Sequence, residues 1–503
     1  MKKIIIGIAI TVGLLIVVGG GVALFIQSML PEKEERIAFR NDDIIKQIDQ
    51  QLEGIDIEKI KTKAPFIEQK TVREIQENIA KNDISYEELV AYYLINIKEY
   101  DQSKDGNNAV SEINPNAIKE AKFFDQMSED LPFKGIPVLV KENINTNDMP
   151  TSSGTDALKD FIPETNAPVV EELKSNGAII LGKTNLSELS YWLSEKAPSG
   201  YSAKKGQTHN PFNPVELSPS GSSAGSAVSM STDLATVSLG TETLGSIVSP
   251  AAVNSVVGFK PSRDKISGEG VVPITLSLDT VGVITKTVED ALDTYNAASN
   301  QKIEIELQKN AIKGKKIGLL PGEKNFTKSL SRILTQMGAE VVELKEIDTS
   351  KIDTQFIMMN DFEKDFNNYL ESNNAPIKSL KELISYNKED SESRIKYGQS
   401  LLEKSLAFSD NDDTKVEEII KKANEQLDKV MTDNNLHAIV FQDNSGVVLT
   451  ATSGAPEITV PFGQNDTQPI GATFSGRLGD DAAILNIAYS FEQHTKLRQI
   501  PNQ

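Results

Sequence analysis

Two serines in turns of small residues are the side chains of this sequence best suited to nucleophilic chemistry. Ser222 lies within SPSGSSAGS (218–226), and Ser246 lies within GTETLGSI (240–247). Small residues let backbone N–H groups approach a substrate closely. A serine hydroxyl attacks a carbonyl group when a nearby base accepts its proton. The chemistry therefore depends on which base the chain supplies.

Composition narrows the choice of base and excludes several kinds of site. The chain has no cysteine, so a thiol nucleophile, a redox CxxC pair and a cysteine zinc site are impossible. The three histidines, His209, His437 and His494, are scattered and show no metal-binding spacing. We therefore expect neither a metal nor a cofactor.

A histidine-dependent serine elbow is one arrangement that the sequence leaves open. The segment GSSAG (221–225) matches G-x-S-x-G with Ser223 at its centre. That motif needs a strand before it, and an acid and a histidine later in the chain. The preceding residues 214–219 include two prolines and do not resemble a buried strand. A Ser-His-Asp esterase that uses Ser223 with His437 or His494 remains an alternative.

A buried lysine is the second candidate base. Lys141 directly follows the apolar run GIPVLV (135–140). At its ordinary pKa only about one lysine in 2,500 is neutral at pH 7, a cost of about 4.6 kcal/mol. Burial beside an apolar strand end lowers that pKa. Because a lysine stem reaches poorly into a tight turn, Ser222 would carry the proton of Ser246 to Lys141.

The elements around these residues predict an α/β fold. Two capping boxes, Thr71–Glu74 and Ser85–Glu88, begin the globular body. Short apolar runs then alternate with helical patterns, which favours a mixed or parallel sheet flanked by helices. The predicted strands are 135–140, 178–181, 234–239, 255–259, 315–320, 339–344, 438–442, 457–461 and 470–474. The predicted helices include 167–175, 286–297, 325–337 and 480–495, and residues 350–435 read as a polar helical cap. We expect one large domain over residues 68–503.

The N-terminal part of the chain predicts a membrane anchor. Residues 4–26 carry no charged side chain, and a helix of that length spans about 34 Å, enough to cross a bilayer. We expect residues 1–3 to form a short cytoplasmic tail and residues 27–67 a charged stalk. The lysines at positions 2 and 3 favour a single-pass protein whose catalytic domain is extracytoplasmic.

The net charge of −20 argues against a nucleic-acid partner. Binding to phosphates requires a basic surface. We therefore expect the membrane to be contacted through the N-terminal helix alone, and we expect no nucleic acid to bind.

Several segments in the same order along the chain resemble the amidase signature family, over almost everything after residue 68. They are GIPVLVKENI (135–144), SPSGSSAGSA (218–227), GTETLGSI (240–247), PAA (250–252), VVGFKP (256–261), DTVG (279–282) and VPFG (460–463). The resemblance implies a single amidase-signature domain with a mixed sheet.

The resemblance also implies roles for individual residues. Lys141 is the base, Ser222 the relay serine after a cis peptide bond from Gly221, and Ser246 the acylated nucleophile. The backbone N–H groups of residues Thr243, Leu244, Gly245 and Ser246 form the oxyanion hole, which needs no particular side chain. The expected reaction is hydrolysis of a linear carboxamide, through an acyl-enzyme, with release of ammonia or an amine.

Departures from the family pattern bear on the substrate. The family often has Asp, Gly and Arg where this chain has Glu242, Leu244 and Val248, and Gly in place of Ala224. Glu242 followed by a non-glycine residue at 244 resembles a subgroup that includes peptide amidases. The charged residues Asp361, Glu363, Lys364 and Asp365 and the segment 380–387 also resemble that subgroup. Small amides or amidated peptides are thus the expected substrates, and a catalytically silent binding module of the same fold is the remaining alternative.

Overall fold

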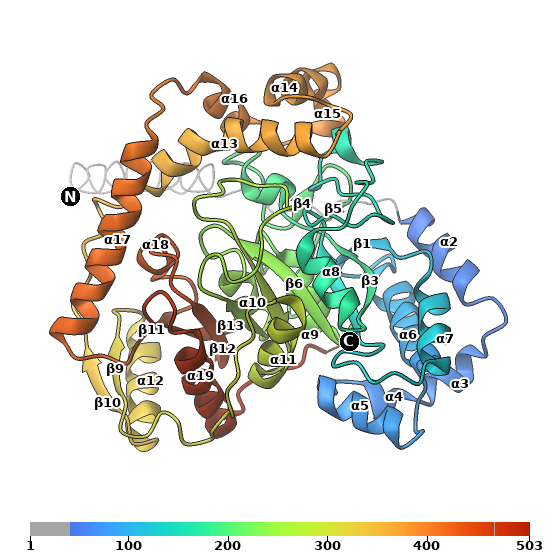
Figure 1. Ribbon diagram of the computed structural model, residues 1–503, viewed down its shortest axis with the longest axis horizontal. Coiled ribbons are helices and arrows are strands. Elements are labelled where there is room, and N and C mark those ends of the chain that lie inside the picture. The colour runs from blue at the N-terminus through green and yellow to red at the C-terminus, as the bar shows by residue number, and fades with distance from the viewer. Residues whose placement is uncertain (1–40, 467, 503) are drawn as a thin grey trace, which may run out of the picture. The chain divides into compact units, whose positions relative to one another are not determined.

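The computed structural model describes residues 41–466 and 468–502, and these residues are built around one mixed sheet. The strand order is β1-β3-β2-β6-β8-β7-β12-β13-β11-β9-β10, and a separate hairpin pairs β4 with β5 (Figure 1). The strands are β1 (Val110–Ile113), β2 (Pro137–Lys141), β3 (Ile179–Thr184), β4 (Tyr201–Ser202), β5 (Gly206–Gln207), β6 (Val237–Glu242), β7 (Val257–Lys260), β8 (Thr280–Thr285), β9 (Lys316–Leu319), β10 (Glu340–Glu343), β11 (Ala438–Gln442), β12 (Glu457–Asn465) and β13 (Gln468–Ser475).

The sheet confirms the predicted α/β class and the nine predicted strands, and it adds strands that the sequence did not reveal. Strands β2, β3 and β6 are parallel, as are β9, β10 and β11, whereas the middle of the sheet is antiparallel. The central strand β8 was missed because its sequence, TVGVIT, mixes threonine and glycine with apolar residues, although all six residues are buried.

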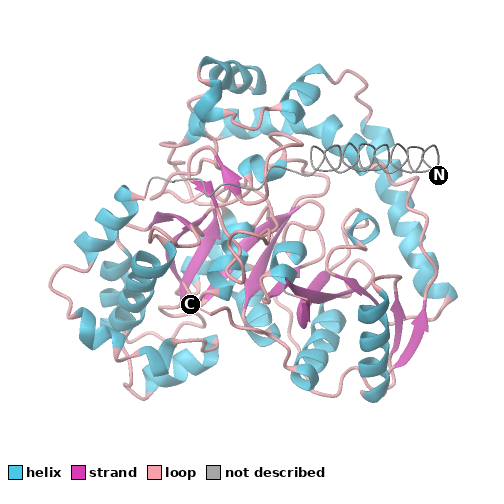
Figure 2. Cartoon of the chain, turned by 180° about the vertical axis from the view of Figure 1, so that it is seen from behind, coloured by secondary structure: helices cyan, strands magenta, loops and turns pink. Residues whose placement is uncertain are grey.

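Helices flank the sheet in two groups that both contact its central strands. Figure 2 shows helices around the strands of the sheet. Helices α9 and α10 pack together, and α11 packs against α8 and α19. The α-helices that follow residue 71, apart from those of the cap, are α5 (Val72–Ala80), α6 (Tyr86–Asn96), α7 (Ala117–Gln126), α8 (Pro168–Ser175), α9 (Ala224–Ser231), α10 (Val248–Val253), α11 (Val288–Ala298), α12 (Lys324–Gln336), α18 (Val447–Thr450) and α19 (Asp481–Thr495). Thr71 and Ser85 form the predicted capping boxes of α5 and α6.

The polar segment predicted as a helical cap is helical and joins β10 to β11. It consists of α13 (Thr354–Ser372), α14 (Leu380–Glu389), α15 (Ser391–Arg394), α16 (Ser400–Ala407) and α17 (Asp413–Asp433). Helix α13 holds the loop 274–279 through two acidic side chains one turn apart. Asp361 Oδ2 accepts hydrogen bonds from the hydroxyls of Thr275 and Ser277, both at 2.6 Å, and Asp365 Oδ2 accepts from the Leu276 N–H at 2.8 Å.

Residues 41–67 belong to the globular body, which corrects the predicted stalk over 27–67. They form α2 (Asp42–Gln51), α3 (Ile57–Lys61) and α4 (Ala64–Ile67). Ile44, Ile48, Ile60 and Ile67 are buried in the main hydrophobic core. The helical spacing of the isoleucines in this charged segment was visible in the sequence, but the surface that covers them was not.

The predicted membrane helix, residues 4–26, lies outside the described residues. Among residues 41–466 and 468–502, none of the helices combines the length and the apolar character that crossing a bilayer requires.

Candidate active site

The three residues predicted to react are carried by neighbouring elements. Lys141 ends β2 and Glu242 ends β6, and these two strands are parallel neighbours. The carboxyl ends of parallel strands meet at one edge of a sheet, where ligands commonly bind. Ser222 stands just before α9, and Ser246 lies in the loop between β6 and α10.

Lys141 is fully buried and makes three short contacts. Its Nζ lies 2.7 Å from Ser222 Oγ, 2.8 Å from Thr241 Oγ1 and 3.3 Å from the Thr241 carbonyl oxygen. Burial lowers the pKa of Lys141 to about 7, against the opposing influence of the Asp279 and Glu242 carboxyl groups. A large share of this amine is therefore neutral near neutral pH.

A neutral Lys141 amine can make all three contacts. Such an amine has two N–H donors and one lone pair. The two oxygens of Thr241 can accept the N–H groups, which leaves the lone pair for the hydroxyl proton of Ser222. Asn143 Nδ2 also donates to Thr241 Oγ1 at 3.0 Å and fixes that hydroxyl in place.

Ser222 is held in a crowded, buried turn. The Gly221–Ser222 peptide bond is cis, as the family resemblance implied. The Ser222 carbonyl oxygen accepts the Ser187 N–H at 3.1 Å. A Cβ atom on Gly221 would lie 2.4 Å from Ser187 Oγ, so any side chain before the relay position would require Ser187 to move.

Ser246 lies in a loop whose backbone donors are free. None of the N–H groups of residues 243–246 donates to an acceptor in the part of the chain that the structure describes. The loop is shaped by Gly245, whose φ of 83° lies in the left-handed region. The Ser246 carbonyl oxygen accepts the Ser223 N–H at 3.2 Å, which joins the two serine segments through their backbones. A group of unpaired N–H donors is what stabilisation of an oxyanion requires.

Two carboxyl groups fix the ends of this loop. Glu242 Oε2 accepts the N–H groups of Ile247 and Val248 at 2.6 and 3.0 Å. The Thr243 hydroxyl donates to Asp279 Oδ1 at 2.5 Å. Burial raises the pKa of Asp279 to about 6.

Sequence reasoning did not identify Thr241, Asn143 or Asp279, because their contacts depend on which strands are neighbours in the sheet.

Ser223, the centre of the elbow motif, has a structural position. It is fully buried, and its hydroxyl donates to the Thr241 carbonyl oxygen at 3.1 Å and accepts the Thr241 N–H at 3.2 Å. The two histidines considered for a triad lie elsewhere. His437 is exposed and accepts the Lys316 N–H through Nδ1, and His494 is exposed in the last turn of α19.

Two of the four residues that depart from the family pattern, Leu244 and Val248, contact an apolar cluster. Val248 is a buried member of that cluster, and half-buried Leu244 packs against it. The cluster also contains Leu278 and Val447. The side chain of Leu244 is therefore accommodated by apolar neighbours next to the loop that carries Ser246.

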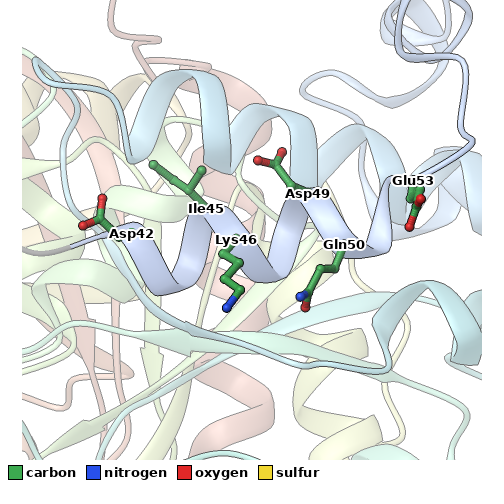
Figure 3. A pocket seen from close by; sticks show the side chains of 6 residues that line it. All are labelled: Asp42, Ile45, Lys46, Asp49, Gln50 and Glu53. Carbon is green, nitrogen blue, oxygen red and sulfur yellow. The ribbon is translucent and has the colours of Figure 1, made fainter.

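A shallow hollow on helix α2 is separate from these residues. It is lined by Asp42, Ile45, Lys46, Asp49, Gln50 and Glu53 (Figure 3). Five of these side chains are exposed and polar, and none belongs to the candidate site.

Comparison with known proteins gives the class of protein that this fold and site define. The amidase family profile matches residues 88–441. A probable amidase of Arabidopsis thaliana is 32% identical over 473 residues, which cover 86% of this chain and 92% of the relative. The chain belongs to the amidase family and is an amidohydrolase that acts on amides.

Two solved structures have the same fold as this chain. An amidase family protein from Bacillus anthracis is 39% identical, with a TM-score of 0.91 over 94% of this chain and all of that chain. The native peptide amidase from Stenotrophomonas maltophilia is 32% identical, with a TM-score of 0.82 over 87% of this chain and 99% of that chain. The amidase-signature resemblance found in the sequence is thus confirmed.

Proposed function

We propose that this chain hydrolyses linear carboxamides through an ester formed on Ser246. The observation that carries the proposal is the 2.7 Å contact between the buried amine of Lys141 and Ser222 Oγ, beside the loop of Ser246. Burial lowers the pKa of Lys141 to about 7, so the amine can act as a base at neutral pH. In this scheme Lys141 is the base, Ser222 the relay and Ser246 the nucleophile.

Acylation begins when Ser222 passes its proton to Lys141 and accepts the proton of Ser246. Ser246 Oγ then attacks the carbonyl carbon, and the N–H groups of Thr243, Leu244, Gly245 and Ser246 bind the oxyanion. The relay needs a hydrogen bond between the two serine hydroxyls, which we expect to form when substrate binds, because catalytic hydrogen bonds often tighten only in the substrate complex.

Collapse of the tetrahedral intermediate breaks the C–N bond. The leaving nitrogen takes a proton from Ser222, which is restored by Lys141, and departs as ammonia or an amine. Water then attacks the ester, with the same relay accepting its proton. The products are a carboxylic acid and free Ser246, so atoms and protons balance without a cofactor.

Amidated peptides and small amides are the substrates we propose. Support comes from the similarity to the peptide amidase of Stenotrophomonas maltophilia.

Ammonia release from a panel of small amides and C-terminally amidated peptides tests this function. We expect turnover by the full chain and loss of turnover by more than a thousandfold in Ser246→Ala and Lys141→Met. The matched control is Ser223→Ala, which removes a hydroxyl of the same turn and is expected to keep Ser246 reactive. Loss of activity in Ser223→Ala with activity retained in Ser246→Ala would favour the elbow arrangement instead.

We also propose that residues 4–26 anchor the enzyme in the cell membrane with the catalytic domain outside the cytoplasm. Support comes from the uncharged run and the lysines that precede it. Membrane fractionation tests the anchor, and protease treatment of intact cells tests its orientation. Recovery in the soluble fraction, or full protection of the domain in intact cells, would refute the respective part of the proposal.

A further inference from the structure

A second glutamate lies against Glu242, beneath the loop that carries Ser246. Glu242 and Glu457 are both buried, each has one carboxyl oxygen without a donor among the described residues, and the two carboxyl groups interact electrostatically. Glu242 ends β6 and Glu457 begins β12, so the two residues come from separate strands of the sheet. The loop amides and Glu457 thus contact the same carboxyl group.

The hydrogen bonds around Glu242 and Glu457 leave one oxygen of each carboxyl group available to share a proton. Glu242 Oε2 accepts the backbone N–H groups of Ile247 and Val248. Glu457 Oε1 accepts the hydroxyl proton of Thr450. The other two oxygens, Glu242 Oε1 and Glu457 Oε2, are buried and have no further donor among the described residues. Two buried carboxyl groups in contact are stable only when a proton lies between them.

Charges around Glu457 favour its protonated form. Burial and the Glu242 carboxyl group raise the pKa of Glu457 well above its ordinary value, and Lys260 on β7 opposes this only in part. Lys260 Nζ instead donates to the carbonyl oxygens of Ala455 and Pro261, at 2.5 and 3.2 Å. The adjacent strand β13 contributes Ser475 opposite Glu457, which is not a titrating side chain.

We propose that Glu457, as a neutral acid, is a positioning residue that donates its proton to Glu242 and thereby holds the loop 243–248 in its reactive shape. The inference rests on the proposed function, since it assigns that loop to the oxyanion. Fixing Glu242 Oε1 leaves Oε2 pointing at the Ile247 and Val248 N–H groups. These two bonds from Glu242 hold the chain directly after Ser246. Val248 itself has no charged side chain that could bind the Glu242 carboxylate.

Replacement of Glu457 by glutamine and by leucine tests the proposal in the full chain. Glutamine keeps an oxygen for Thr450 and presents an N–H donor to Glu242, so we expect E457Q to retain kcat within about threefold. Leucine removes the donor, so we expect E457L to lower kcat by 10- to 100-fold with KM changed by less than threefold, because the loop binds the transition state. T450V, which removes the hydroxyl donor to Glu457 together with its 3.2 Å bond to the Gly446 carbonyl oxygen, is a milder variant whose kcat should fall by less than that of E457L.

Stability against pH gives a readout that does not depend on turnover. A carboxyl group whose pKa is raised in the folded state stabilises the fold at low pH, and this contribution is lost as pH rises from about 4.5 through the folded pKa. The thermal unfolding midpoint should therefore fall less steeply with pH in E457Q than in wild type. E492Q is the matched control for kcat. It also removes a carboxyl group with a raised pKa, about 7 for Glu492 on α19, but this group accepts the Val288 N–H away from the site. It should leave kcat unchanged.

The outcomes separate the inference from the proposed function. An active wild type in which E457Q loses as much kcat as E457L, or in which both retain full activity, would overturn the role of Glu457. A wild type that turns over no amide would overturn the proposed function, whatever the variants do. If E457L does not fold, the unfolding curves of E457Q and the kcat of T450V decide the question.

Discussion

The pH dependence of acylation is the most direct test of Lys141 as the base. Burial lowers the pKa of Lys141 from 10.5 to about 7. The difference corresponds to about 4.8 kcal/mol in the free energy of forming the neutral amine that starts the reaction. At pH 6 about 9% of such amines are neutral and at pH 8 about 91%, so kcat/KM should rise about tenfold over this interval and then level off.

Initial rates of ammonia release at substrate concentrations well below KM give the required profile. Lys141→Met should lose the inflection near pH 7 together with most of the rate. Lys183→Met is the matched control, because burial also lowers the pKa of Lys183 to about 7. Its amine instead contacts Thr151 Oγ1 at 2.5 Å and the Ile144 carbonyl oxygen at 3.0 Å, so the midpoint should stay in place in this variant.

Two results would refute this reasoning. A wild-type kcat/KM that still rises tenfold per pH unit above pH 9 would mean that the base has an ordinary lysine pKa. A midpoint near pH 7 that disappears in Lys183→Met and persists in Lys141→Met would assign the titration to Lys183 and not to Lys141.

Three further predictions follow from other contacts. Thr241→Val removes a hydroxyl that accepts a hydrogen bond from Lys141 at 2.8 Å. Because that bond favours the charged amine, the midpoint of the pH–rate profile should move to lower pH. An unchanged midpoint would contradict this prediction. Lys286→Met leaves Asp233 buried without its partner at 2.6 Å, so urea unfolding should report a loss of about 3–5 kcal/mol with KM unchanged. A chain beginning at residue 41 should fold, whereas one beginning at residue 68 loses several buried isoleucines worth about 1.5–3 kcal/mol each and should be insoluble or unfolded by circular dichroism.

The parts of the fold that were predicted correctly are those specified by short segments. Strand β2 is a continuous apolar run, and the turns around Ser222 and Ser246 are marked by small residues. Capping boxes at Thr71 and Ser85 likewise need only four consecutive residues. Such signals stay within one element, so the sequence contains all the information that they need.

The parts that were missed depend on contacts between distant segments. Thr241 was not recognised as a partner of Lys141 because the pairing of β2 with β6 is not visible in either strand alone. Glu457 meets Glu242 from a strand far along the chain. The stalk was wrong over residues 41–67 for the same reason, since helical spacing predicts an apolar face but not the surface that covers it.

The connection between β10 and β11 places the whole helical cap in one insertion at the edge of the sheet. The chain leaves the sheet at its edge strand, β10, and re-enters at β11, with β9 between them. Strands β2 and β6, which carry Lys141 and Glu242, lie in the other half of the sheet. A replacement cap inserted between residues 343 and 438 would leave the pairing of β2 with β6 unchanged, but it would have to cover the body residues Leu158, Trp192 and Ile274, which share a hydrophobic core with the cap. Such a cap would need acidic side chains at the positions of Asp361 and Asp365, because these two carboxylates join the cap to the loop next to Asp279.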